Sequence, residues 1–238
     1  MPTLRFPSSD LARLEFTKHA EATARTDFDA GYFYLSRETF DNLTEFAPVY
    51  EARMNKINAL SSRRSKEIEE SSEAFDKMKT CMRDMWEVLR RRVNRMNQPA
   101  QVLTFYELPL DGITPKPTTY DEWYSLAAKM VDGDAKAVEA GYSPMNNPSA
   151  QELKEDLEKA RKERDDISGA DRAYDKAQEG VEELRAKADE LISDVIDDLR
   201  YFLRKMDDAS QRRIMRSYGV TFRYLKGEPE DEMPEEEE

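Results

Sequence analysis

The fold is decided by the stretch AQELKEDLEKARKERDDISGADRAYDKAQEGVEELRAKADELISDVIDDLRYFLRKMD, residues 150–207. From Leu153 to Phe202, every seventh position of this stretch is occupied by an apolar residue. A second series, from Leu157 to Met206, is apolar at both ends and polar between them. Apolar residues repeated every seven positions are typical of a long amphipathic helix packed on another helix, as in a coiled coil.

The same spacing occurs earlier in the chain, from Ala47 to Met96. Both series become polar near the middle, at residues 61–64 and 168–180. Each long helix therefore either continues through a polar middle or folds back there as a hairpin. We favour continuous helices, because the heptad register is the same on both sides of the polar middle. Pro48 predicts a kink or a helix start in the first of them.

The chain carries the signature of an internal duplication. Residues 29–32 (Asp-Ala-Gly-Tyr) recur as residues 139–142 (Glu-Ala-Gly-Tyr), and the same offset aligns Leu89-Arg90 with Leu199-Arg200. Two separate matches at one offset are difficult to obtain by chance. We therefore predict two helical units that pack as one domain, followed by an acidic tail. The predicted boundaries are 1–110 for the first unit, 111–226 for the second and 227–238 for the disordered tail.

Each predicted unit has a short helix, a Gly-Tyr turn and a long helix. The spacing of Thr119 with Glu122, and of Ser149 with Glu152, matches the capping box that begins a helix. Ser36 gives the equivalent start signal in the first unit. The predicted short helices are about 10–29 and 119–139, and the predicted long segments are about 37–97 and 150–207.

Two fragments after the long segments are rich in β-branched and aromatic residues, Val102–Leu108 and Val220–Leu225. Because they occupy equivalent places, they could pair as a two-stranded ribbon. Alternatively, they are extended segments that anchor aromatic rings on the bundle. The predicted fold is therefore all-α, an elongated helical bundle or coiled coil built from two tandem units, with a small ribbon.

The turn Gly141-Tyr142-Ser143-Pro144, followed by Asn147-Pro148 and a long helix, resembles a loose group of bacterial helical-repeat proteins. Members of that group carry a Gly-Tyr-x-Pro-x-Asn-Pro turn before a long Ala/Leu helix. The first unit departs from the pattern, since Gly31-Tyr32 is followed by neither proline. The resemblance implies a bacterial helical scaffold and transfers no activity and no functional residue.

Composition excludes several classes of protein. Of the 238 residues 37% are charged, only 8 are glycine, and there is one Cys and one His, Cys81 and His19. Disulfide frameworks, Cys/His zinc sites and di-iron sites with Glu-x-x-His pairs are therefore excluded. No apolar run is long enough for a bilayer and no signal-peptide pattern is present, so we expect a cytoplasmic protein without membrane contact.

The remaining reactive residues have simpler interpretations. We expect His19 on the surface, Cys81 packed among methionines, and the acids between Glu67 and Glu73 on a solvated helix face. No glycine-rich phosphate loop and no nucleophile motif is present. We therefore expect no catalytic residue, no metal and no cofactor.

Basic residues gather where each long segment ends, and aromatic residues alternate with them after residue 200. Cations are favoured at helix C-termini by the helix dipole, which is the simpler explanation. If the two long helices pack in parallel, both clusters meet at one end of the molecule. The residues that we predict to dock a partner are Arg90, Arg91, Arg95, Arg204, Arg212, Arg213, Arg216 and Tyr218.

These observations favour a non-enzymatic interaction protein, acting as scaffold, adaptor or regulatory partner. Its partner would be another protein of unknown identity, or a second copy of the chain. The alternative is binding of nucleic acid or another phosphate polymer by the arginine-rich end. The net charge of −13 does not exclude this, because eight acids lie in residues 228–238 and the rest of the chain carries −5. In that alternative the acidic tail either shields the basic end until a partner displaces it or serves only to keep the chain soluble.

Overall fold

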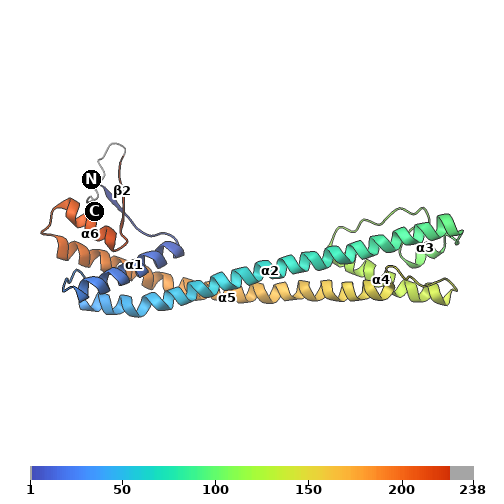
Figure 1. The fold of residues 1–238 in the computed structure, drawn as a ribbon, viewed down its shortest axis with the longest axis horizontal. Coiled ribbons are helices and arrows are strands. Elements are labelled where there is room, and N and C mark those ends of the chain that lie inside the picture. Colours follow the sequence, from blue (N-terminus) through green and yellow to red (C-terminus); the bar gives the residue numbers. More distant parts are fainter. Residues whose placement is uncertain (1, 226–238) are drawn as a thin grey trace, which may run out of the picture. The chain divides into compact units, whose positions relative to one another are not determined.

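The computed structural model describes residues 2–225, so the predicted disordered tail lies outside the described residues. Within residues 2–225 the chain forms six helices and one two-stranded sheet (Figure 1). The all-α prediction with a small ribbon is confirmed. In chain order the elements are β1 (Thr3–Arg5), α1 (Asp10–Asp29), α2 (Arg37–Met96), α3 (Val102–Phe105), α4 (Tyr120–Glu139), α5 (Ala150–Leu203), α6 (Asp208–Ser217) and β2 (Thr221–Arg223).

The chain divides into two compact units. Unit 1 consists of Met1–Ala59 and Asp175–Glu238, and unit 2 consists of Leu60–Tyr174. Unit 1 therefore contains α1, α6 and one part each of α2 and α5, and unit 2 contains α3, α4 and the other parts of the two long helices. These units are not the two predicted copies, because the boundary at residue 110 lies inside unit 2. The duplication itself remains a prediction.

The helix starts lie where the sequence places them. Thr119 and Glu122 form both hydrogen bonds of a capping box at α4. At α5 the amide of Glu152 donates to Ser149 Oγ (3.1 Å), and the amide of Ser149 donates to Glu152 Oε2 (2.6 Å). Before α2, Ser36 Oγ accepts from the amide of Thr39 (3.1 Å). Polar side chains thus satisfy amides that have no partner inside the helix.

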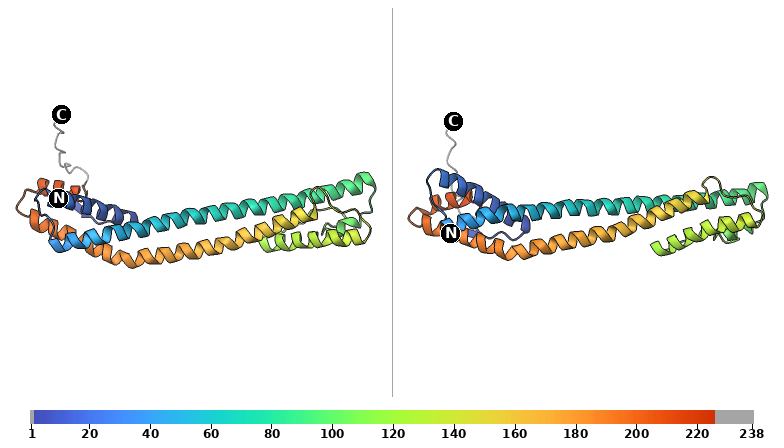
Figure 2. Two further views of the ribbon diagram at one scale, coloured as in Figure 1. Left: turned by 60° about the horizontal axis from the view of Figure 1, so that its bottom comes forward. Right: turned by 90° about the horizontal axis from the view of Figure 1, so that it is seen from below.

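The long helices α2 and α5 are continuous, with 60 and 54 residues, and Pro48 lies inside α2. Within unit 2 they run antiparallel, since Arg64 pairs with Asp171 and Lys77 with Asp156 (2.7 Å). Figures 1 and 2 show the two helices side by side in each unit. The parallel packing considered above does not occur.

Each unit has its own hydrophobic core. In unit 1, α1, α2, α5 and α6 bury residues such as Phe16, Leu43 and Tyr218. In unit 2, α2 to α5 bury Trp86, Tyr106 and Met130 among others. Cys81 belongs to this second core beside methionines, as its sequence neighbours predict.

Several predictions of local structure are wrong. Val102–Phe105 is the short helix α3, and β2 pairs with β1 rather than with residues 102–108. Close packing explains α3, because the carbonyl of Phe105 lies directly on Gly133 of α4. Ile68, predicted in the apolar series, is 46% exposed. Residues 61–66, in the polar middle of α2, are exposed as well.

The chain segments after α3 and α6 share one turn. The amides of Tyr106 and Leu108 both donate to the carbonyl of Leu103 (both 3.1 Å). In unit 1 the amides of Tyr218 and Val220 donate in the same way to the carbonyl of Met215 (3.2 and 3.1 Å). This turn places Leu108 and Val220 at equivalent positions in the two units.

Candidate functional site

The candidate site lies in unit 1, where β2 is held against α1. Gly219 adopts φ +88°, and a Cβ there would lie 3.2 Å from His19 Cβ. A side chain at this position is therefore unfavourable for two reasons, left-handed backbone and close contact. The glycine allows the chain to turn from α6 into β2 while touching α1.

The ribbon presents arginines to solvent. β1 and β2 are antiparallel, with Leu4 opposite Phe222, and these two side chains pack on the unit 1 core. Side chains alternate between the faces of a strand, so Arg5 and Arg223 share the opposite face. Both arginines are exposed. Among residues 2–225, neither guanidinium forms an ion pair or a hydrogen bond.

A groove of about 830 Å³ lies beside the ribbon. Its walls come from the segment before α1, from one face of α1, and from the α6–β2 segment. Apolar lining comes from side chains such as Phe16 and Val220, and charge comes mainly from arginine. The lining residues are Arg5, Phe6, Pro7, Ser8, Ser9, Ala12, Glu15, Phe16, His19, Arg216, Gly219, Val220, Thr221, Phe222 and Arg223.

The groove is positively charged. Arg5, Arg216 and Arg223 line it, and Glu15 is the acid among its lining residues. The guanidinium of Arg216 lies 5.6 Å from the centre of the Phe222 ring and 5.8 Å from that of Tyr224. Arg216 also donates a hydrogen bond to Tyr224 Oη. A cation held against two rings is pre-positioned for an anionic group.

A second hollow of about 280 Å³ also has Phe222 in its lining. It is lined by Arg200 of α5 and Arg212 of α6, with Asp208 beside them. Arg200 forms an exposed ion pair with Asp197 (3.4 Å). We call Arg5, Arg200, Arg212, Arg216 and Arg223 the arginine surface of unit 1.

The structure brings together only some of the predicted docking residues. Arg212 and Arg216 belong to the arginine surface, and Arg213 is exposed on the same helix. The guanidinium of Arg204 lies 3.9 Å from the centre of the Tyr201 ring and donates to the carbonyl oxygen of Tyr201 (2.9 Å). It therefore already has partners in its own segment. The structure adds Arg5, to which the sequence does not point because its strand partner is more than 200 residues away.

The other predicted residues have different surroundings. Arg90, Arg91 and Arg95 belong to unit 2. Arg90 donates twice to the carbonyl oxygen of Gly112 (3.1 and 2.9 Å), so it holds the loop before α4 rather than a partner. Tyr218 is completely buried, and its hydroxyl donates to Asp27 (2.6 Å). A buried side chain cannot contact a partner, which corrects the docking prediction for Tyr218.

The one histidine and the one cysteine of the chain belong to different units, His19 to unit 1 and Cys81 to unit 2. Burial, with the nearby carboxylate of Asp156, raises the pKa of the Cys81 thiol to about 12. The reactive thiolate is therefore scarce at neutral pH.

One group of carboxylates in unit 2 is compact enough to consider as a metal site. Oxygens of Glu67, Glu163 and Asp166 lie within 4.8 Å of one another across α2 and α5. Glu67 already pairs with Arg63 (3.4 Å), and Asp166 is exposed. Acids on the solvated face of a helix pair have this arrangement without a metal.

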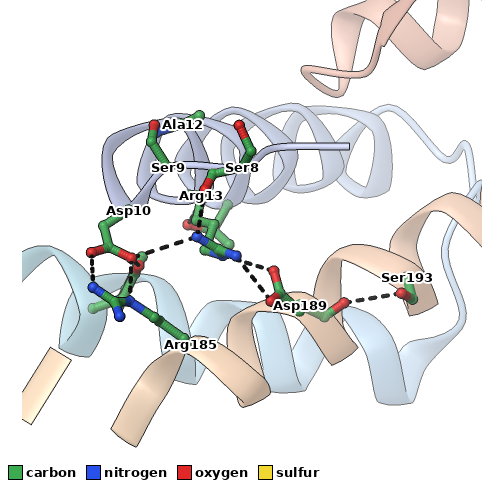
Figure 3. A network of polar contacts seen from close by, with 10 residues as sticks. Ser8, Ser9, Asp10, Ala12, Arg13, Arg185, Asp189 and Ser193 are labelled. Carbon is green, nitrogen blue, oxygen red and sulfur yellow. Dashed lines mark hydrogen bonds and ion pairs between the residues drawn. The ribbon is translucent and has the colours of Figure 1, made fainter. Parts of the chain in front are cut away.

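Two ion pairs fix α1, which forms one wall of the groove, to α5. Arg185 donates to both oxygens of Asp10 (2.8 and 2.7 Å), and Arg13 donates to both oxygens of Asp189 (2.7 and 3.1 Å). Figure 3 shows these facing pairs, with both acceptor carboxylates between the helices. Bidentate pairing fixes orientation as well as distance. The hydrogen bonds from Arg185 lower the pKa of Asp10 below its usual 3.8.

We expect this network to make the stability of unit 1 depend on pH. An acid with a lowered folded-state pKa stabilises the fold above its unfolded pKa, and this contribution is lost as the pH falls through the folded value. Asp10→Asn should therefore cost about 1 kcal/mol at pH 6, as for a partly exposed ion pair. The cost should disappear once the pH falls below the lowered pKa of Asp10, and it is measured at both pH values by urea unfolding with far-UV circular dichroism. Asp175→Asn, an exposed acid in unit 1, is the control, and a cost that is equal at both pH values would contradict the assignment.

No family model, curated protein or solved structure matches this chain. Within residues 2–225, no helix combines the length and the apolar character needed to cross a lipid bilayer.

Proposed function

We propose that the protein is a non-enzymatic interaction protein, a scaffold, adaptor or regulatory partner in a bacterial cytoplasmic complex. It docks an acidic surface of a partner protein on the arginine surface of unit 1. The observation that carries this proposal is the pair Arg5 and Arg223, two exposed guanidinium groups without an acid partner among the described residues, beside a partly apolar groove. Arginine and aromatic side chains are enriched among residues that dominate binding energy at protein interfaces.

A second candidate is binding of nucleic acid or another phosphate polymer at the same surface. The stacking of Arg216 on Phe222 and Tyr224 supports it, because arginine and aromatic rings together bind phosphates and bases. The two candidates differ in salt dependence. Affinity for a phosphate polymer falls steeply with salt, by a factor that grows with each phosphate contacted.

The test is an affinity pull-down of the tagged full chain from host lysate, with and without nuclease. Arg5→Glu/Arg223→Glu reverses the groove charge, and Arg83→Glu/Arg172→Glu makes the same charge change on exposed residues of unit 2 that were not predicted to dock a partner. We expect the pull-down to recover one partner protein in a stoichiometric amount, and nuclease should not remove it. The recovered amount should fall at least tenfold with the groove variant and stay the same with the unit 2 variant. Material lost on nuclease treatment would favour the second candidate. A protein retained by the groove variant would contradict docking at this surface.

A further inference from the structure

The groove of unit 1 has a complementary segment in its own chain. Residues 227–238 read GEPEDEMPEEEE and carry eight carboxylates, one methionine and two prolines. This segment lies outside the described residues. The groove offers three arginines above an apolar lining that includes Phe6, Phe16 and Val220. Charge and apolar character are therefore matched between the two.

We propose that the acidic segment 227–238 binds the arginine groove of unit 1 in cis and competes there with the partner. This inference rests on the proposed function, because it names the regulation of the same surface. Arg223 lines the groove and is separated by only three residues from the start of the segment. At about 3.4 Å per extended residue, residues 226–238 can span about 40 Å. The segment can therefore reach each arginine of the groove without a rearrangement of unit 1.

The tether makes this binding effective even if the intrinsic affinity is low. A segment attached through a few residues to its binding site has an effective concentration of about 1 mM or more. A free acidic ligand at micromolar concentration must compete with this higher effective concentration of the acidic segment. Removing the negative charges of the segment should therefore open the groove to ligands supplied from outside.

The experiment uses the full chain and a labelled synthetic peptide with the sequence of residues 227–238. In one variant, the eight acids of the segment are changed to Gln or Asn, so that chain length is kept. The acids are Glu228, Glu230, Asp231, Glu232, Glu235, Glu236, Glu237 and Glu238. Peptide affinity is measured by fluorescence anisotropy at several salt concentrations.

We expect the peptide to bind the neutralised chain at least tenfold more tightly than the unaltered chain, with affinity falling as salt rises. Adding Arg5→Glu/Arg223→Glu to the neutralised chain should abolish binding, whereas Arg83→Glu/Arg172→Glu should leave it unchanged. Equal affinity for the neutralised and unaltered chains would overturn the proposal. Binding that survives the groove variant would overturn it as well.

The outcomes separate this proposal from the proposed function. If the peptide behaves as expected and the pull-down partner is retained by the groove variant, the segment binds the groove and the partner docks elsewhere. If the partner is lost with the groove variant and the peptide affinities are equal, the groove docks a partner without competition in cis. Each proposal can therefore fail alone.

Discussion

Gly133→Ala should destabilise unit 2 by about 3 kcal/mol, toward the upper end of the usual cost of overpacking a core. A Cβ at Gly133 would lie 1.6 Å from the carbonyl oxygen of Phe105 and 2.7 Å from its carbonyl carbon. The obstructing atoms belong to the backbone and cannot turn away. The α3 segment is also held from two sides, because Trp86 Nε1 donates to the carbonyl oxygen of Tyr106 (3.0 Å) and Tyr106 Oη donates to Asp134 (2.6 Å). Relief of the clash must therefore separate α3 from α4.

The measurement is urea unfolding followed by tryptophan fluorescence. Both tryptophans, Trp86 and Trp123, belong to unit 2, so the fluorescence signal reports this unit and not unit 1. Gly169→Ala is the matched control, because this helical glycine has open space around its missing Cβ. It should stabilise the same unit by about 0.5 to 1 kcal/mol, the usual gain from alanine over glycine in a helix. If Gly133→Ala unfolds at the same urea concentration as the unaltered chain, the close contact of α3 with α4 is wrong.

The sequence predicts the helices well because their signals are local. Ser149 and Glu152 are three residues apart, and their hydrogen bonds depend only on the backbone between them. The heptad spacing from Leu153 likewise specifies which face of α5 is buried. The helices α1 and α4 begin and end within one residue of their predicted bounds.

Non-local packing decides the features that the sequence does not predict. The fragment after residue 102 has strand-like composition, but it forms a short helix that packs closely on Gly133 of α4. The strand after Gly219 finds its partner near residue 4, and no periodicity links the two. The direction in which α2 and α5 pair is also absent from a heptad pattern, which fits parallel and antiparallel helices equally.

In the candidate site, too, local sequence signals identify some residues and non-local packing decides the others. Arg212 and Arg216 are identified from the sequence because they belong to the basic run that follows the second long segment. Arg5 joins them only through strand pairing. Tyr218 follows directly after the same basic helix, yet the fold turns it into the core. The composition of the basic run does not separate side chains that face solvent from those that face inward.

Tyr218→Ala should destabilise unit 1 by about 4 kcal/mol, because it removes a completely buried aromatic side chain. Tyr218→Phe keeps the ring and removes the hydrogen bond to Asp27, so it should cost about 1.5 kcal/mol. Burial, together with this hydrogen bond to a carboxylate, raises the pKa of Tyr218, so the hydroxyl stays a donor across the working pH range. Urea unfolding followed by far-UV circular dichroism gives both values.

The same pair of variants decides whether Tyr218 acts in folding or in docking. Tyr106→Phe is the matched control, because Tyr106 makes the equivalent bond to Asp134 in unit 2 and its loss is visible by tryptophan fluorescence. Under conditions where Tyr218→Phe is fully folded, we expect the pull-down partner to bind it as well as the unaltered chain. A variant that folds normally and loses the partner would instead place the Tyr218 hydroxyl at the interface. That result would require unit 1 to open at α6 on binding, since in the closed unit no ligand can reach this side chain.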